Sequence, residues 1–166
     1  MPTFDAKAQT VLVVDDDPGV LTLCRTLLQQ AGFSVLPAAG SSEALKICKH
    51  HPGTIDILVT DLVLPPPEFS FASGENEFPH VHGHELAVRA LGMRDNLRIV
   101  LMSGNIDKDL AGYGIRKGCV PFIAKPFETQ AMIDMVRETL QTPPPTPESL
   151  MNEPMNRAKG TDEWFG

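Results

Sequence analysis

The sequence predicts an α/β fold with a parallel sheet and helices on both of its faces. First, five short apolar runs alternate with segments whose apolar residues recur at helical spacing. Second, these runs are apolar at consecutive positions, as in residues 11–14, which is typical of parallel strands buried on both sides. Third, 42% of residues are hydrophobic but only 6% are aromatic, which favours an aliphatic core. A chain of 166 residues is expected to form one such domain.

Five strands are expected, and three of them end at charged side chains. The first ends at three consecutive aspartates, Asp15 to Asp17, the third ends at Asp61, and the fifth at Lys125. The fourth ends at a hydroxyl, that of Ser103. The expected ranges are 11–14, 33–36, 55–60, 99–102 and 120–124.

Helices are expected between these strands, with recognisable start and stop signals. Asp17 is expected to cap the first helix, and Gly32 to end it. Ser41 or Ser42 is expected to cap the second. The expected helices cover about 18–30, 41–48, 83–91, 107–117 and 128–140.

The chain divides into a short N-terminal extension, residues 1–9, one domain, residues 10–141, and a C-terminal tail, residues 142–166. The tail opens with a proline run that favours an extended linker, so it is expected to be disordered. Within the domain, residues 66–82 have no periodicity and form an inserted loop. Loops beyond roughly 12–15 residues are usually either functional or disordered.

Charge and composition exclude several classes of protein. A net charge of −7 argues against binding to nucleic acid or to an anionic membrane, because phosphates are bound by clustered Lys and Arg. No apolar run approaches the roughly 20 residues that span a bilayer, and the first ten residues do not form a signal peptide. The three cysteines are widely spaced, which favours buried thiols in a cytoplasmic protein.

Five polar side chains are expected to meet at one edge of the sheet, because ligands of open α/β sheets bind at the carboxyl ends of the strands. They are Asp15, Asp16, Asp61, Ser103 and Lys125. Three close carboxylates need a cation to stay ionised, and oxygen ligands suit Mg²⁺. Lys125 and Ser103 would then contact phosphoryl oxygens, while Asp61 acts as a carboxylate nucleophile that forms an aspartyl phosphate.

Four motifs closely resemble those of the receiver domains of two-component response regulators. They are Val13-Val14-Asp15-Asp16-Asp17-Pro18, Thr60-Asp61-Leu62-Val63-Leu64-Pro65, Leu101-Met102-Ser103-Gly104 and Lys125-Pro126-Phe127. The resemblance covers about residues 10 to 141. It implies a flavodoxin-like (βα)5 fold, a doubly wound five-stranded sheet of order 2-1-3-4-5, with the long loop after the third strand as a departure. The implied role is a signalling domain rather than an enzyme.

The resemblance also assigns a role to each site residue. Asp61 is the phosphoacceptor. The ligands implied for Mg²⁺, for which Mn²⁺ is expected to substitute, are Asp16, Asp61, the backbone carbonyl of Val63 and, through water, Asp15. Lys125 and Ser103 bind the phosphoryl group.

The resemblance also implies roles for three further residues, in the conformational switch and in the lifetime of the phosphorylated state. Phe122 stands where the family carries its switch aromatic, whose rotamer changes with Ser103, although an aromatic in a buried strand is also an ordinary core residue. Val63 and Asn105 flank the site where the family tunes the lifetime of the phosphorylated state. The Lys125-Pro126 bond is a candidate cis peptide.

Two features depart from the family pattern. The stretch between Pro65 and Gly83 is much longer than the family's usual turn, so it either covers the site, contacts a partner or is a passive surface excursion. It ends in the alternating histidines of residues 80–84, which can bind a transition metal only on an extended backbone, whereas His84 is expected to start a helix.

The expected partners are a histidine kinase or a histidine phosphotransfer protein and an unknown downstream protein, with homodimerisation left open. The chain is read either as a stand-alone receiver or as the receiver of a hybrid histidine kinase. Two other classes compete with this reading. A receiver-like scaffold would lack phosphorylation, but all the residues needed for it are present. A haloacid-dehalogenase-type phosphatase would need a different continuation after its D-x-D motif than Pro18-Gly19.

Overall fold

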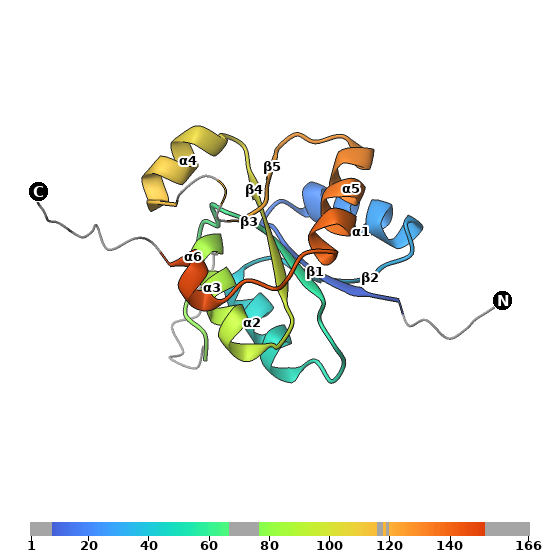
Figure 1. Cartoon of the computed structure of the whole chain (residues 1–166), viewed down its shortest axis with the longest axis horizontal. Coiled ribbons are helices and arrows are strands. Elements are labelled where there is room, and N and C mark those ends of the chain that lie inside the picture. Colours follow the sequence, from blue (N-terminus) through green and yellow to red (C-terminus); the bar gives the residue numbers. More distant parts are fainter. Residues whose placement is uncertain (1–7, 67–76, 116–117, 119, 152–166) are drawn as a thin grey trace, which may run out of the picture.

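The structure is a computed structural model that describes residues 8–66, 77–115, 118 and 120–151 (Figure 1). Five strands and six helices alternate along these residues. They are β1 (Thr10–Val14), α1 (Pro18–Gln30), β2 (Ser34–Ala38), α2 (Ser41–His50), β3 (Ile57–Asp61), α3 (Gly83–Met93), β4 (Arg98–Ser103), α4 (Ile106–Tyr113), β5 (Phe122–Ala124), α5 (Thr129–Leu140) and α6 (Pro147–Leu150).

All five strands form one parallel sheet in the order β2-β1-β3-β4-β5, which confirms the expected order. The register aligns the carboxyl ends of the central strands. Val14 of β1 lies opposite Thr60 of β3, the residue before Asp61, and Ser103 of β4 lies opposite Ala124 of β5. The side chains that follow each strand therefore meet at one edge of the sheet.

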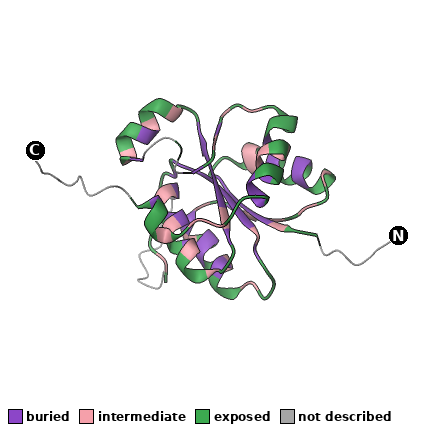
Figure 2. Cartoon of the chain, viewed as in Figure 1, coloured by how far each residue is buried: buried purple, intermediate pink, exposed green. Residues whose placement is uncertain are grey.

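Each face of the sheet is covered by its own helices, as Figures 1 and 2 show. Alternate residues of β1 point to opposite faces, so that Leu12 belongs to one buried cluster and Val13 to the other. Helices α1 and α5 supply the second cluster, and α2, α3, α4 and α6 supply the first. The buried, aliphatic character of both clusters confirms the core that the composition predicted.

Helix α1 begins and ends at its local sequence signals, whereas α4 does not. Asp17 caps α1 by accepting a hydrogen bond from the Gly19 N–H at 2.8 Å, and Gly32 after the helix has a positive φ of 101°. Helix α4 ends at Tyr113 rather than at residue 117, because Gly114 takes up the left-handed conformation with φ 68°. The sequence prediction for the end of α4 was therefore too long.

The C-terminal segment differs from expectation where the structure describes it. Instead of a disordered tail from residue 142, Arg98 donates to the Thr142 carbonyl at 3.0 Å and the short helix α6 packs against α3. Thr146 and Ser149 form a capping box for α6, and Leu150 is buried at 3% exposure. An apolar anchor after the proline run holds this part of the segment on the domain. The expected tail beyond Met151, including Trp164, lies outside the described residues.

The cysteines and the absence of a membrane-spanning segment are two further expectations from the sequence. Cys24 and Cys48 are buried free thiols, which confirms them as core residues, and burial raises their pKa values to about 12 and about 11. Cys119 lies outside the described residues. None of the helices in the described ranges has the length and apolar character needed to span a membrane.

Candidate phosphoacceptor site

Three aspartates gather at the carboxyl ends of β1 and β3, and we call them the acidic cluster. Asp15 is fully buried, Asp61 is 7% exposed and Asp16 is exposed to solvent. One carboxylate oxygen from each of them lies within 4.8 Å of the others. The structure thus brings together the three acidic residues that the strand ends predicted.

Lys125, which follows β5, bridges the two buried members of this cluster. Its Nζ lies 3.0 Å from Asp15 Oδ2 and 3.0 Å from Asp61 Oδ2. The other oxygen of Asp15 accepts from the Asp17 N–H at 2.9 Å, and that of Asp61 accepts a long hydrogen bond from the Val63 N–H at 3.4 Å. The following Lys125-Pro126 bond is cis, as expected.

The electrostatics of the site leave a surplus of negative charge. Burial, followed by the Asp15 charge, raises the pKa of Asp61, although its hydrogen bond to Lys125 opposes this shift. Burial lowers the pKa of Lys125, but its hydrogen bonds to Asp15 and Asp61 outweigh that effect and raise it. One ammonium therefore compensates three carboxylates incompletely.

This donor set fits a hard divalent cation. The acidic cluster offers only oxygen ligands, one of its carboxylates faces solvent, and its net charge is negative even with Lys125 counted. Among the described residues, these three form the group of acidic, histidine or cysteine side chains close enough to hold one ion. Asp16 and Asp61 would hold the cation, whereas the side chain of Asp15 is fully buried.

Ser103 lies at the end of β4, and its hydroxyl is hydrogen-bonded to a residue of α4. The residue is fully buried, and its Oγ donates to Asp109 Oδ2 at 2.6 Å while accepting from the Asn105 N–H at 3.0 Å. The Asn105 side chain in turn caps α4 by accepting from the Lys108 N–H at 3.2 Å. The predicted Ser103 and Asn105 both lie here. Asp109 was missed, and its only sequence signal is an acidic residue in the first turn of a helix.

Two further predicted residues are Phe122 at the start of β5 and Val63 after β3. Phe122 is partly buried and packs against the α2/α3/α4 side of the core, which is compatible with both the switch and the core interpretation. Val63 follows Asp61 closely in sequence and is 38% exposed.

Comparison with known proteins agrees with this geometry. The response regulator receiver domain family model matches residues 11–68. The crystal structure of a response regulator receiver protein from Sinorhizobium medicae WSM419 is 26% identical with a TM-score of 0.64, and the match covers 82% of this chain and 97% of that one. The receiver domain of hybrid histidine kinase CckA is 26% identical with a TM-score of 0.60, covering 80% and 99% of the two chains. This chain contains a response regulator receiver domain.

Its curated relatives are longer proteins. The C4-dicarboxylate transport transcriptional regulatory protein DctD of Pseudomonas aeruginosa is 33% identical, over 83% of this chain and 26% of its own length. The DNA-binding transcriptional regulator NtrC of Azospirillum brasilense is 28% identical, over the same shares of 83% and 26%. The receiver chain therefore spans about a quarter of the length of these relatives.

The long loop of this receiver domain leaves and rejoins the fold beside Asp61. We call residues 62–66 and 77–83 the loop base. The Gly83 N–H donates to the Leu62 carbonyl at 3.0 Å, and a Cβ at Gly83 would lie 2.1 Å from the Asp61 carbonyl oxygen. Only glycine permits this close approach, because any Cβ at position 83 would overlap the Asp61 backbone. Residues 67–76, including Phe69 and Phe71, lie outside the described residues.

Two histidines satisfy the backbone of this loop base. The Leu64 N–H donates to His82 Nδ1 at 3.0 Å, and the Leu64 carbonyl accepts a hydrogen bond from His80 Nε2. The third, His84, donates through Nε2 to the Leu150 carbonyl of α6. Because Leu64 is buried in an irregular segment, its backbone needs such partners. The alternating histidines thus have a structural role, and the described residues do not gather them into a metal-binding group.

The two serines at the start of α2 also hold the loop base rather than the helix. The N-cap residue is Gly40 and makes no side-chain cap, so the prediction of a serine N-cap was wrong. Ser41 Oγ instead accepts from the Val81 N–H at 2.8 Å, and Ser42 donates to the Phe78 carbonyl. Competition from the returning loop explains the difference.

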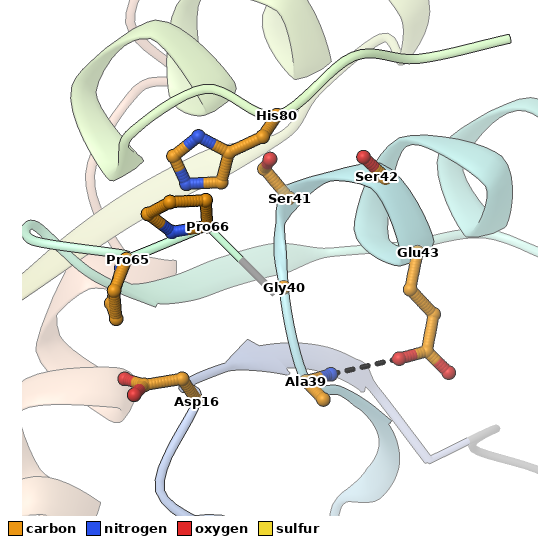
Figure 3. A pocket seen from close by; sticks show the side chains of 9 residues that line it. All are labelled: Asp16, Ala39, Gly40, Ser41, Ser42, Glu43, Pro65, Pro66 and His80. Carbon is orange, nitrogen blue, oxygen red and sulfur yellow. Dashed lines mark hydrogen bonds between the residues drawn. The ribbon is translucent and has the colours of Figure 1, made fainter. Parts of the chain in front are cut away.

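A hollow of about 500 Å³ lies between the loop base, α2 and the acidic cluster (Figure 3). Pro65, Pro66 and His80 line it from the loop, while Asp16 lines it from the end of β1. On the α2 side, Glu43 accepts from the Ala39 N–H at 2.8 Å. The solvent-exposed member of the acidic cluster is therefore open to this hollow.

Proposed function

We propose that this receiver domain accepts a phosphoryl group on Asp61 from the phosphohistidine of a histidine kinase or a histidine phosphotransfer protein. The observation that carries the proposal is the bridging of Asp15 and Asp61 by Lys125, at 3.0 Å from each, beside the exposed Asp16. A carboxylate nucleophile, a group of oxygen ligands for a cation and a fixed ammonium then lie together at one edge of the sheet, as phosphoryl transfer requires.

The proposed transfer exchanges one bond to phosphorus for another. An Asp61 carboxylate oxygen forms the new P–O bond while the P–N bond to the donor imidazole breaks, and the leaving nitrogen keeps the electron pair. Lys125 remains on Asp15 and turns to a phosphoryl oxygen, and Ser103 donates to another. A bound Mg²⁺, with Mn²⁺ as a substitute, supplies charge neutralisation for the phosphoryl oxygens. Phe122 moves with Ser103 and changes the surface offered to a protein partner.

The competing functions receive less support. A scaffold that has lost phosphorylation would not need the charged pair of Asp61 and Lys125, which is costly to bury. A haloacid-dehalogenase-type phosphatase lacks its motif here, and hydrolysis of an added phosphate ester would reveal one. The net charge of −7 supports protein rather than nucleic-acid partners for this chain. NtrC is named a DNA-binding regulator, but the match covers only 26% of it. We place the domain in the cytoplasm.

The direct test is labelling by a small phosphodonor. Acetyl phosphate or phosphoramidate with Mg²⁺ is expected to add one phosphoryl group per chain, detected by intact-mass measurement, and Asp61→Asn is expected to prevent it. Asp95→Asn, which removes an exposed carboxylate before β4, is the matched control and should label normally. Full labelling of the Asp61→Asn protein would refute the assignment of the phosphoacceptor.

A further inference from the structure

The hydroxyl of Ser103 already donates a hydrogen bond in this structure. It donates to Asp109 Oδ2 at 2.6 Å, a short hydrogen bond of the kind made to a charged acceptor. A hydroxyl carries a single proton, so it can donate to only one acceptor at a time. In the proposed function that proton is needed by a phosphoryl oxygen on Asp61.

We infer that Asp109 is a positioning residue that holds the Ser103 hydroxyl on α4 in the unphosphorylated domain, so that phosphorylation of Asp61 must break a bond to α4. This inference rests on the proposed function. The phosphoryl group and Asp109 compete for one proton, and the competition sets how strongly the domain favours its unphosphorylated form.

Helix α4 is the element best placed to respond to this exchange. It has eight residues, and among them only Leu110 is buried. Ser103 holds its start by donating to Asp109 and accepting from the Asn105 N–H. The far end of α4 reaches the loop base, where the Tyr113 ring lies 5.5 Å from the His82 ring, centroid to centroid. Loss of the Asp109 bond therefore loosens a lightly buried helix that touches the loop base.

A simpler role for Asp109 can be separated from this one. An acidic residue in the first turn of a helix is favourable by itself, because it faces the positive end of the helix dipole. Asp107 lies in the same turn and carries the same charge, but Ser103 donates to Asp109. Asp107→Asn is therefore the matched control for removing charge from α4.

The test is the affinity for beryllofluoride in Mg²⁺, a stable analogue of the phosphoryl group, measured by calorimetry. Asp109→Ala frees the Ser103 hydroxyl and is expected to tighten binding by about tenfold, the factor that goes with one hydrogen bond to a charged group. Asp109→Asn keeps a neutral acceptor and should tighten binding less. Asp107→Asn should change it by less than about twofold. Circular dichroism checks that each variant is folded.

A double-mutant cycle with Ser103→Ala distinguishes positioning from charge removal. With no hydroxyl to hold, Asp109→Ala is expected to lose its effect, leaving a change within about twofold. An equal gain in both backgrounds, or no gain in the wild-type background, would overturn the inference while leaving the proposed function intact. A wild-type protein that binds no beryllofluoride in Mg²⁺ would overturn the proposed function and this inference together.

Discussion

The acidic cluster and the loop base lie on either side of the Asp61 backbone, yet they are held together by opposite means. The acidic cluster combines three carboxylates with one lysine and retains unbalanced charge. In the loop base, Ser41, His80 and His82 satisfy backbone groups through hydrogen bonds, and an exposed ion pair joins Glu77 to Lys49 of α2. The first region retains uncompensated negative charge, whereas in the second the backbone groups of Leu64 and Val81 are hydrogen-bonded to side chains of the domain.

This contrast extends to the pKa values on the two sides. Burial and the Asp15 charge raise the pKa of Asp61, whereas burial and the neighbouring His80 lower the pKa of His82. Folding therefore favours the proton on Asp61 and disfavours it on His82. Acidification is therefore expected to reduce the repulsion between the carboxylates of the acidic cluster and to weaken the hydrogen bonds of the loop base.

The largest effect is expected where the two regions touch. Gly83→Ala would place a Cβ 2.1 Å from the Asp61 carbonyl oxygen, an atom of the backbone that cannot turn away. We expect a loss of about 3 kcal/mol in the free energy of unfolding, measured by urea denaturation.

Gly92→Ala on the same helix is the matched control. A Cβ there would meet nothing within 4 Å among the described residues, so the substitution should instead add up to about 1 kcal/mol through helix propensity. Equal effects of the two substitutions would show that the contact between Gly83 and Asp61 does not hold the loop base.

The next effect concerns the loop base alone. His82→Ala leaves the Leu64 N–H without its acceptor and should cost about 2 kcal/mol at pH 8. Because the folded-state pKa of His82 lies below 6.5, the wild type should lose this contribution as pH falls from 6.5 through that pKa. Unfolding free energies of wild type and variant are therefore expected to converge on acidification. The exposed His50→Ala should change stability by less than about 0.5 kcal/mol at pH 8.

A smaller effect of opposite sign is expected in the acidic cluster. Asp61→Asn removes a buried charge next to Asp15, so without divalent cations the variant should be more stable by about 1 kcal/mol at pH 8. The wild type should recover this difference as pH falls through the raised pKa of Asp61, because its folded state then binds the proton. Urea denaturation in a chelator, from pH 8 down to the ordinary carboxyl pKa of 3.8, measures both. A wild type that is more stable than the variant at pH 8 would contradict the charge surplus.

The sequence predicted the acidic cluster well because its geometry follows from topology. The apolar runs predict where the strands end, and the family resemblance supplies their order. The parallel register then brings Asp15, Asp61, Ser103 and Lys125 to one edge of the sheet. The aspartate cap of α1 and the position of Gly32 were equally local and were also confirmed.

The contacts of the loop base and of Asp109 could not be predicted in the same way. Ser41 has the local signal of a helix cap, but its hydroxyl instead accepts a hydrogen bond from the backbone N–H of Val81, 40 residues later. His84 pairs with Leu150, 66 residues away, in a segment whose prolines indicated disorder. Long-range hydrogen bonds of this kind override the local conformational preference of a residue, and no periodic sequence pattern predicts them.

The smallest effect on stability is expected at Asp16, and it separates function from folding within the acidic cluster. Asp16 is exposed beside the hollow, so water already screens its charge and Asp16→Ala should change the apo stability by less than about 0.5 kcal/mol. Mg²⁺ raises the stability of any domain that binds it only when folded, by an amount set by the ratio of its concentration to the dissociation constant. The wild type should therefore gain thermal stability as MgCl₂ is added, and Asp16→Ala should not, with choline chloride matching the ionic strength. If the variant kept the full magnesium response, Asp16 would not be the ligand, and the cation site would have to lie deeper, on Asp15 and Asp61.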